Sequence, residues 1–260
     1  MMKSKLAVVL LSGGLDSATV LYLAKARGYK CFCLIFDYGQ KHRREIQSAK
    51  DIASLAKCAY RVLKISLPWK GSSLLDKHKE IPRPAVKLNA QTAKKDIPST
   101  YVPGRNIIFL SFALSYAEAI KASAIFIGAN ALDYSGYPDC RPAFLRAFSK
   151  VAACGTKAGS SRSGIKICAP LVNKNKSQII KLGASLKVPF GLSWSCYRGG
   201  KSPCGRCESC FYRAKGFKEA RLVDPALLKE NRFKMQGRAH FFLGGHGQNA
   251  SKGWVEGRAG

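Results

Sequence analysis

The sequence predicts an α/β protein: a Rossmann-like, doubly wound parallel sheet of about five strands, followed by a small C-terminal lobe. Two observations predict this class. Short apolar runs alternate with longer segments of helical periodicity, and a glycine turn joins the first apolar run to the first such segment. Strands and helices that alternate at these lengths need crossover connections, which build a parallel sheet with helices on both faces.

The first part of the chain supplies three strands and two helices. The run 6–11 is apolar throughout and ends at a glycine pair, as expected of a strand buried on both faces. Asp16 and Ser17 are residues that favour helix N-caps, and Gly28 suits the end of the helix that follows. The other elements predicted here are a strand over 31–36, a helix over 41–57 and a strand over 60–65.

A long loop interrupts this pattern. Five prolines and Gly71 lie between residues 68 and 103, and such a loop in a compact domain usually forms a lid or a substrate-binding segment. The regular pattern then resumes with a helix over 107–120, a strand over 124–128, a helix ending near 153, a strand over 165–169 and a helix over 176–186. We expect one domain over 1–190, the small lobe over 191–220 and an irregular tail over 221–260.

The composition is that of a folded globular protein. Of 260 residues, 47% are hydrophobic and 10% aromatic, which excludes a disordered chain. The apolar run near the N-terminus is too short to span a bilayer and lacks a signal-peptide cleavage pattern. Ten cysteines without an export signal predict a reducing compartment, where thiols stay free or bind metal. We therefore expect a cytoplasmic protein with no membrane partner.

The chain is strongly basic. Its formal net charge is +29, and residues 140–207 contain thirteen Lys or Arg and no Asp or Glu. Such a field attracts polyanions, for example tRNA or the phosphates of ATP; the alternative is a lysine-rich surface typical of a basic proteome. The basic residues are spread singly, without an arginine-rich tract, so we expect no stable nucleic-acid partner.

The segment Ser12–Ser17, with the sequence SGGLDS, lies between the first strand and the first helix. Two glycines there expose backbone N–H groups at the positive end of a helix dipole, which is an arrangement that binds phosphate. The hydroxyls of Ser12 and Ser17 are suited to donate to phosphate oxygens, and the Asp16 carboxylate to hold Mg²⁺. A glycine turn without a ligand is the alternative interpretation.

No lysine follows the glycines, so the loop is not a Walker A sequence. It resembles the pyrophosphate-binding loop of the PP-loop ATP pyrophosphatases, also described as adenine nucleotide alpha-hydrolase-like, which cleave ATP between its α and β phosphates. That resemblance implies adenylation of a substrate. The predicted ATP site consists of Leu10, Leu11, Ser12, Gly13, Gly14, Leu15, Asp16, Ser17, Ala18, Thr19 and Val20.

Four of the ten cysteines, Cys196, Cys204, Cys207 and Cys210, lie within fifteen residues of one another. Four thiolates at this spacing are sufficient to enclose a tetrahedral metal ion, and Zn²⁺ is the usual occupant. Because sulfur takes every position, such a metal is structural and the C-terminal lobe is a zinc-binding lobe. An iron–sulfur cluster and a redox pair of thiols remain as alternatives.

The segment 129–142, ANALDYSGYPDCRP, follows a predicted strand and so lies at the carboxyl edge of the sheet, where open α/β folds bind ligands. A carboxylate such as Asp133 or Asp139 is able to accept both donors of a 2-amino-6-oxopurine, while Tyr134 or Tyr137 stacks on the ring. Arg141 is suited to hold a substrate carboxylate. An ordinary polar loop with capping aspartates explains the same residues.

Six motifs occur in order along the chain: SGGLDS, DYGQKHR, YVPGRN, GANALDYSGYPDCRP, PLVNKNKSQII and the cysteine segment from SWSCY to CGRCESC. Together they resemble the 7-cyano-7-deazaguanine synthase (QueC) family. The resemblance implies a carbon–nitrogen ligase that uses ATP, Mg²⁺ and structural zinc to convert 7-carboxy-7-deazaguanine and ammonia to the nitrile, through adenylated acid and amide, in queuosine biosynthesis.

For the catalytic residues we select Asp16, Arg105 and Arg141, and for the substrate Asp133, Tyr134, Tyr137, Asp139 and Arg141. Arg105 and Asn106 stand at a predicted helix start, where Asn106 has the alternative role of a helix cap. We also expect a homodimer. The main rival is a PP-loop enzyme that modifies tRNA by thiolation or lysidine formation; a zinc-ribbon nucleic-acid-binding protein is a weaker one, since it leaves the glycine loop unexplained.

Overall fold

The computed structural model describes residues 5–69, 71–76, 78–83, 97–130, 136–160 and 164–226, which all belong to one unit that ends at Ala226. Five parallel strands form a sheet in the order β3-β2-β1-β4-β5. This confirms the predicted α/β class. The strands are β1 (Leu6–Leu10), β2 (Lys30–Asp37), β3 (Ala59–Lys64), β4 (Ala124–Phe126) and β5 (Lys166–Cys168).

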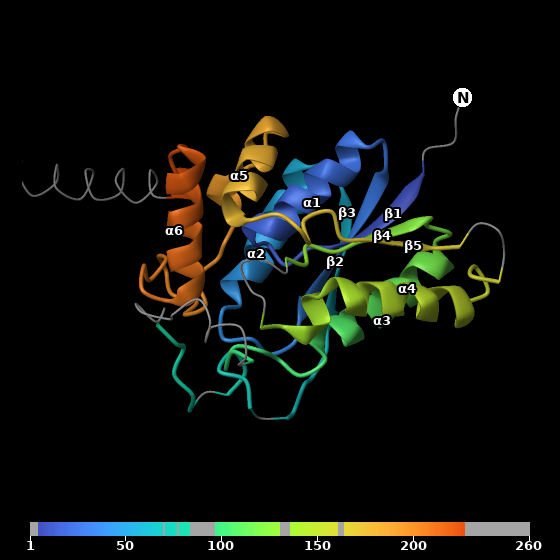
Figure 1. Cartoon of the computed structure of the whole chain (residues 1–260), viewed down its shortest axis with the longest axis horizontal. Helices are drawn as coiled ribbons and strands as arrows, with labels where there is room; N and C mark the ends of the chain where they lie inside the picture. The colour runs from blue at the N-terminus through green and yellow to red at the C-terminus, as the bar shows by residue number, and fades with distance from the viewer. Residues whose placement is uncertain are drawn as a thin grey trace, which may run out of the picture. The chain divides into compact units, whose positions relative to one another are not determined.

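Helices cover both faces of this sheet (Figure 1). Among the described residues they are α1 (Leu15–Ala26), α2 (Arg44–Leu55), α3 (Arg105–Ala119), α4 (Pro142–Cys154), α5 (Lys176–Ser185) and α6 (Glu208–Ala220), with short 3-10 turns at Pro138–Cys140 and Phe190–Leu192. Figure 1 shows α3 and α4 on one side of the strands and α1, α2 and α5 on the other. The helices predicted near α1 to α5 are therefore present, whereas the sequence analysis assigned no helix at α6.

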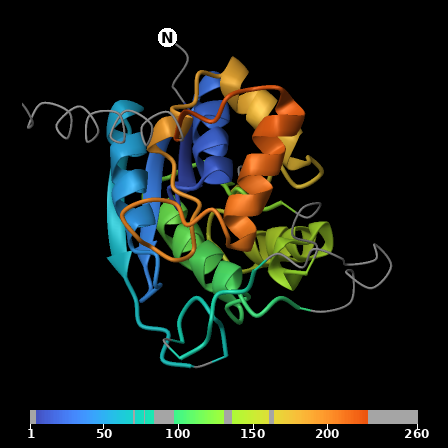
Figure 2. The same ribbon diagram turned by 90° about the vertical axis from the view of Figure 1, so that its left-hand side faces the viewer.

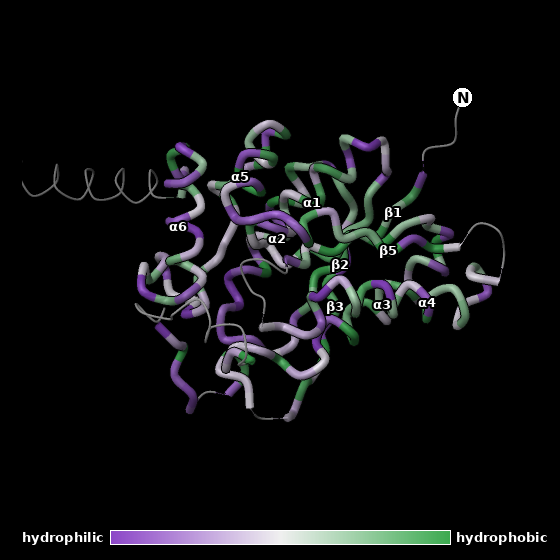
Figure 3. Tube along the Cα trace, in the orientation of Figure 1, coloured by the Kyte–Doolittle hydropathy of each residue, from purple (hydrophilic) through white to green (hydrophobic). Residues whose placement is uncertain are grey.

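The protein has two hydrophobic cores, one on each face of the sheet, because successive side chains of β1 point to opposite faces. Val8 packs against residues of α3 and α4, whereas Ala7 and Val9 pack against residues of α1, α2 and α5. All three side chains are fully buried, because helices cover a parallel sheet on both faces and its central strand has no polar side. Hydrophobic residues accordingly concentrate along the strands and the inner helices (Figure 3).

The strand order reverses between β1 and β4. The chain leaves β1 toward one side of the sheet and leaves β4 toward the other, so their carboxyl ends open a crevice at the switch point. At Gly128, just after β4, an added Cβ would lie 3.1 Å from the backbone nitrogen of Ser17 in α1. The exit of β4 and the start of α1 thus form adjacent walls of this crevice.

Helix α6 packs beside α5, as Figure 2 shows. Arg213 of α6 is buried and donates two hydrogen bonds to Asp224, from Nε at 2.6 Å and from a terminal nitrogen at 2.8 Å. Its other terminal nitrogen donates to the hydroxyls of Ser193 and Ser195, at 2.9 and 3.2 Å. Asp224 belongs to the segment assigned to an irregular tail, yet it is only 6% exposed; residues 227–260 of that segment lie outside the described residues.

The structure corrects one helix start. Asp16 and Ser17 were predicted as N-caps of the first helix, but the N-cap is Gly14, whose backbone is extended, and α1 begins at Leu15. Asp16 and Ser17 lie inside the first turn, so their side chains are free to face the crevice. Within the described residues, no helix combines the length and the hydrophobicity needed to cross a membrane.

We predict that Asp224→Ala lowers the free energy of unfolding by about 3–5 kcal/mol, because it leaves the buried guanidinium of Arg213 without its carboxylate. Denaturant unfolding followed by circular dichroism measures the change. Asp51→Asn, at an exposed position on α2, is the control and should change stability by less than about 0.5 kcal/mol. Equal effects of the two substitutions would contradict the structural role assigned to the pair.

Candidate active site

The loop between β1 and α1 turns where only glycine fits. Gly13 has φ of +82°, and an added Cβ would lie 2.2 Å from the backbone oxygen of Glu45 and 2.7 Å from the backbone nitrogen of Ala49. Both neighbours are backbone atoms of α2 and are unable to move aside as a flexible side chain would. The glycine loop is therefore pressed directly onto the start of α2.

Two serine hydroxyls meet within this loop. Oγ of Ser17 accepts the N–H of Ser12 at 3.2 Å, donates to the carbonyl of Gly14 at 3.1 Å and lies 3.1 Å from Oγ of Ser12. The hydroxyls stand at the N-terminus of α1, where the helix dipole is positive. Hydroxyl and backbone donors in this position favour an anion such as a phosphate.

Lys176 pairs with Asp16 at the edge of this site. Its Nζ donates to both carboxylate oxygens of Asp16, at 2.9 and 2.8 Å. The capping box of α5 fixes the position of Lys176, because Asn175 accepts the N–H of Gln178 at 2.9 Å and its own N–H is bound by the Gln178 side chain. The sequence analysis noted this motif but assigned no role to Lys176. The sequence signal for this residue was its place at the first position of a capped helix.

A pocket of about 250 Å³ opens between the glycine loop, the ends of β2 and β4, the start of α3 and the segment 194–197. Of the predicted ATP site, Leu10, Leu11, Ser12, Gly14, Leu15, Asp16 and Ser17 line the pocket. Ala18, Thr19 and Val20 do not: their side chains are fully buried within the core. The hydroxyl of Thr19 donates to the carbonyl of Leu15. Gly13 does not line the pocket either, and the assignment of these four residues to the ATP site stays a prediction.

Aromatic side chains and one arginine form the opposite wall. Phe36 stacks on Phe109, with ring centroids 4.0 Å apart and planes within 6°. Arg105, at the start of α3, donates to the hydroxyl of Tyr38 at 3.2 Å. Burial raises the pKa of Tyr38 to about 12, so its phenol is neutral at physiological pH. All four side chains line the pocket, and together they offer flat apolar faces beside a cation.

The predicted substrate residues separate into three groups. Tyr137 lines the pocket, and its hydroxyl lies 2.6 Å from that of Thr100. Asp133 and Tyr134 lie outside the described residues. Asp139 and Arg141 do not line the pocket: Arg141 is exposed and is the N-cap residue of α4.

Asp139 is held by hydrogen bonds within the protein. It is 4% exposed, and its carboxylate accepts the backbone N–H of Asn106 at 3.0 Å, in the first turn of α3. The Asn106 side chain donates to the carbonyl of Asp139 and to Sγ of Cys140, both at 3.2 Å. Asn106 is therefore not the helix cap, since Gly104 is the N-cap and Asp139 supplies the capping carboxylate. Burial raises the pKa of the Cys140 thiol to about 12.

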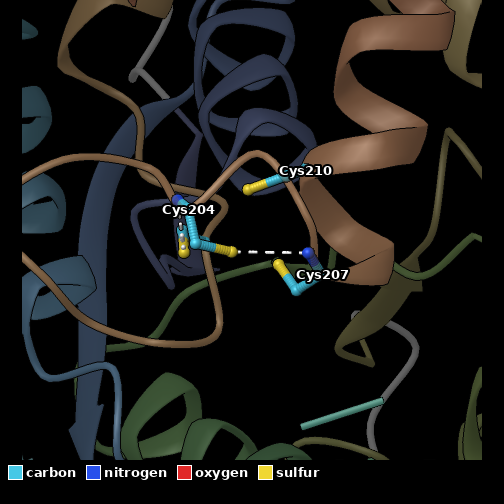
Figure 4. Close-up of side chains that lie close together, drawn as sticks. Cys204, Cys207 and Cys210 are labelled. Carbon is cyan, nitrogen blue, oxygen red and sulfur yellow. Dashed lines mark hydrogen bonds between the residues drawn. The ribbon is translucent and has the colours of Figure 1, made fainter. Parts of the chain in front are cut away.

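The four C-terminal cysteines come together. Their Sγ atoms all lie within 4.8 Å of one another, and a tetrahedral zinc with Zn–S bonds of ~2.3 Å needs sulfurs ~3.8 Å apart. Backbone N–H groups donate to these sulfurs, as from Cys207 to Sγ of Cys204 at 3.3 Å (Figure 4) and from Cys204 to Sγ of Cys196 at 3.3 Å. Such bonds favour thiolates, so the donor set suits a divalent metal.

The cysteine lobe is joined to the glycine loop by Trp194. The backbone N–H of Trp194 donates to the carbonyl of Gly13 at 2.9 Å, and its indole donates to the carbonyl of Cys196 at 2.8 Å. The guanidinium of Arg44 lies over the indole ring, 4.5 Å from its centroid. Trp194, Ser195 and Tyr197 also line the pocket. The lobe thus forms one wall of the site.

Two further pocket residues, His42 and Glu45, were not assigned by the sequence analysis. Nε2 of His42 lies 3.1 Å from a carboxylate oxygen of Glu45. Both residues line the pocket, and both belong to the turn and first residues of α2 that follow DYGQ. The DYGQKHR motif carried the signal, but only the folded chain shows that its histidine lines the pocket.

This arrangement defines a class of protein. A glycine loop between a central parallel strand and the N-terminus of a helix, at the switch point of a doubly wound sheet, defines a nucleotide-binding α/β protein. The absence of a lysine after the glycines separates it from proteins with a Walker A loop.

The family follows from comparison with known proteins. The model of the family "Queuosine biosynthesis protein QueC" matches residues 6–221. A 7-cyano-7-deazaguanine synthase of Trichodesmium erythraeum is 49% identical over 85% of this chain and 99% of its own length. Enzymes of the same name from Nostoc punctiforme and Picrophilus torridus are 52% and 51% identical, over 84% and 82% of this chain and 97% and 87% of theirs. The chain belongs to the QueC family.

The chain also has a distant likeness to a solved structure. NMN synthetase from Francisella tularensis aligns with a TM-score of 0.44 and 16% identity, over 95% of this chain and 90% of that one. This likeness carries no functional argument.

We predict one zinc per chain in purified protein, measured by inductively coupled plasma mass spectrometry. Cys207→Ser should lose the metal and lower the free energy of unfolding by about 4 kcal/mol, the contribution of a ligand present at roughly 1,000 times its Kd. Cys154→Ser, which changes an exposed thiol outside the cluster, should retain metal and stability. Iron in place of zinc, or full stability of the Cys207→Ser variant, would contradict the assignment.

Proposed function

We propose that the protein is an ATP-dependent carbon–nitrogen ligase that converts 7-carboxy-7-deazaguanine and ammonia to 7-cyano-7-deazaguanine for queuosine biosynthesis. One observation carries this proposal: the glycine loop and the aromatic wall with Arg105 line the same pocket, at its two ends. Membership of the QueC family and relatives named as this synthase support it.

The glycine-loop end is suited to the phosphates of ATP. Donors at the N-terminus of α1, with the hydroxyls of Ser12 and Ser17, receive the pyrophosphate portion. Lys176 adds a cation next to Asp16. Asp16 and Ser17 would hold Mg²⁺, in competition with Lys176 for the carboxylate, and the ion would offset negative charge on the phosphates.

The aromatic end is suited to a flat heterocyclic acid. Phe36, Phe109 and Tyr137 offer ring surfaces for stacking. We assign the substrate carboxylate to Arg105, because this guanidinium lines the pocket whereas Arg141 is exposed outside it. Asp133 and Tyr134 remain our proposal for the purine edge.

The proposed reaction activates a substrate oxygen twice, first that of the carboxylate and then that of the amide. The substrate carboxylate attacks the α-phosphorus of ATP and pyrophosphate leaves; ammonia then displaces AMP to give the amide. The amide oxygen attacks the α-phosphorus of a second ATP; pyrophosphate leaves and the nitrogen loses one proton, which gives the adenylated imidate. Loss of AMP and of the second proton then gives the nitrile. Positioning the reactants in one pocket and placing cations and helix-end donors around the α-phosphate are the main contributions of the protein.

The cysteine cluster has a structural part in this proposal. Four sulfur ligands complete a tetrahedral zinc site and leave no position for water or substrate. Zinc would fix the segment 194–197, whose side chains form a pocket wall. It would thus shape the site without entering the reaction.

A PP-loop enzyme that modifies tRNA is the alternative, and the net charge of +29 favours it. Thiolation needs a reactive cysteine, however, and the pocket cysteine, Cys140, is a poor one. Burial raises its pKa to about 12, and its sulfur accepts a hydrogen bond from Asn106. A thiol that stays protonated at neutral pH is a weak nucleophile.

Two further assignments complete the proposal. A homodimer is supported by exposed hydrophobic side chains on α3, where Ile107 and Phe112 are 47% and 43% exposed. A cytoplasmic location is supported by the thiols, since all ten cysteines are free.

We predict that purified protein with ATP, Mg²⁺, ammonium and 7-carboxy-7-deazaguanine forms the nitrile, with the amide as an intermediate, when no tRNA is present. The Ser12→Ala/Asp16→Ala double variant should form both products about 100-fold more slowly, because it removes a hydroxyl that donates to phosphate and a carboxylate proposed to hold Mg²⁺. Ser111→Ala, an exposed position on α3, is the control. Mass spectrometry follows the products, and turnover that requires tRNA would contradict the proposal and favour the alternative.

A further inference from the structure

His42 is a buried histidine in the wall of the pocket with one ring nitrogen uncommitted. The residue is 4% exposed and lines the pocket. Its Nδ1 is buried and has no hydrogen-bond partner among the described residues. A buried polar atom that lacks a partner costs free energy, so this nitrogen is available to a group bound in the pocket that His42 lines.

The other ring nitrogen is held by a chain of fixed groups. Nε2 lies 3.1 Å from Oε2 of Glu45, and Oε1 of Glu45 accepts a hydrogen bond from Gln40 at 3.0 Å. Gln40 is itself fixed, because its side chain donates to the carbonyl of Phe36 and accepts the N–H of Tyr38. Both oxygens of the carboxylate are therefore engaged, one of them by the imidazole.

This contact favours one tautomer of the imidazole. A carboxylate oxygen accepts hydrogen bonds and does not donate them, so the nitrogen that faces Glu45 carries the proton. In the neutral ring the proton is then absent from Nδ1, which is left with a lone pair. A carboxylate that orients an imidazole in this way is the usual partner of a histidine that acts as a base.

The position of His42 places it between the glycine loop and the cysteine lobe. The backbone oxygen of Glu45 contacts Gly13, where an added Cβ would lie 2.2 Å away. On the other side, a Cβ at Gly199 would lie 2.9 Å from Cα of His42. The ring of Tyr197, which also lines the pocket, lies 5.6 Å from that of His42. The backbone of this segment thus contacts the glycine loop at Glu45 and the cysteine lobe at His42.

The proposed reaction requires a base at this end. When ammonia adds to the adenylated acid, the new nitrogen must lose a proton as AMP leaves. The amide nitrogen loses one proton when its oxygen is adenylated. When the resulting adenylated imidate becomes the nitrile, the remaining N–H bond breaks, the third C–N bond forms and the C–O bond to AMP breaks. Each step therefore releases one proton from nitrogen near the α-phosphate, and the protein must provide an acceptor.

Other titratable groups that line the pocket are less suited. Asp16 is paired with Lys176 through both oxygens, and both oxygens of Glu45 are engaged. Burial raises the pKa of Tyr38 and of Cys140 to about 12 in each case, so both are already protonated. Among the described pocket residues, His42 combines a free lone pair with a fixed orientation.

We propose that His42, oriented by Glu45, is the catalytic base that accepts the proton from the substrate nitrogen in amide formation and again in dehydration of the amide to the nitrile. This inference rests on the proposed ligase function. In amide formation the lone pair of ammonia forms the C–N bond, and the pair of the broken N–H bond stays on nitrogen as AMP leaves with the C–O pair. In dehydration the N–H pair forms the third C–N bond and AMP again leaves with the C–O pair; in both steps the proton moves to Nδ1. Glu45 is a positioning residue that stabilises the imidazolium formed.

The test separates adenylation from proton removal. Adenylation is measured as the exchange of labelled pyrophosphate into ATP that requires 7-carboxy-7-deazaguanine, a reaction that needs no base at nitrogen. Dehydration is measured as the nitrile formed from added 7-amido-7-deazaguanine and ATP. For His42→Gln we expect exchange within about threefold of the wild type and nitrile formation slower by about 100-fold, the usual contribution of a general base. Glu45→Gln, which keeps the shape of the side chain, should show normal exchange and an intermediate loss of about 10-fold.

His78→Gln, at an exposed position, is the matched control and should match the wild type in both assays. Wild-type rates of nitrile formation in His42→Gln, or equal loss of exchange and nitrile formation, would overturn the role of His42 as base. If His42→Gln does not fold, as judged by zinc content and circular dichroism, Glu45→Gln decides, and a wild-type nitrile rate there overturns the inference. A wild-type protein without exchange or nitrile instead refutes the ligase function itself.

Discussion

The close approach of Gly13 to α2 is the constraint on which the rest of the site depends. The chain turns there with positive φ, in a space where a Cβ would meet two backbone atoms of α2. This contact directs the N–H groups and hydroxyls at the start of α1 into the crevice between β1 and β4. It also brings the first residues of α2, among them Glu45, to the phosphate end of the pocket.

The same glycine connects the nucleotide loop to the cysteine lobe. Its carbonyl accepts the N–H of Trp194, whose indole in turn donates to Cys196. The buried Arg213 then ties the segment after Trp194 to α6 and to Asp224. A metal at the four cysteines would therefore act on catalysis through geometry, because the segment it fixes is also the wall of the pocket. Loss of metal is expected to disturb the phosphate site without removing any group that touches it.

Local signals in the sequence were sufficient for the fold. Apolar runs, helical periodicity and the glycine pair predict β1 to β5 and α1 to α5, because each depends on neighbouring residues. Contacts between distant segments were not predictable in this way. Asp139 caps α3 from thirty-three positions away, Lys176 meets Asp16 across the crevice, and the environment of His42 is formed by three separate segments. Chemistry alone does not show which way a loop residue points, so the sequence did not reveal that Asp139 and Arg141 lie outside the lining of the pocket.

The most direct test of this account compares the ATP affinities of the Gly13→Ala and Gly14→Ala variants. Isothermal titration calorimetry with Mg²⁺ present measures both affinities. At Gly14 the backbone has φ of −78°, and the nearest atom to an added Cβ is 3.5 Å away, so alanine fits and the affinity should fall by less than about threefold. At Gly13 alanine forces the loop off α2, and we predict a loss of about 100-fold while the metal content of the folded protein is unchanged. Equal affinities in the two variants would contradict the central role of this contact.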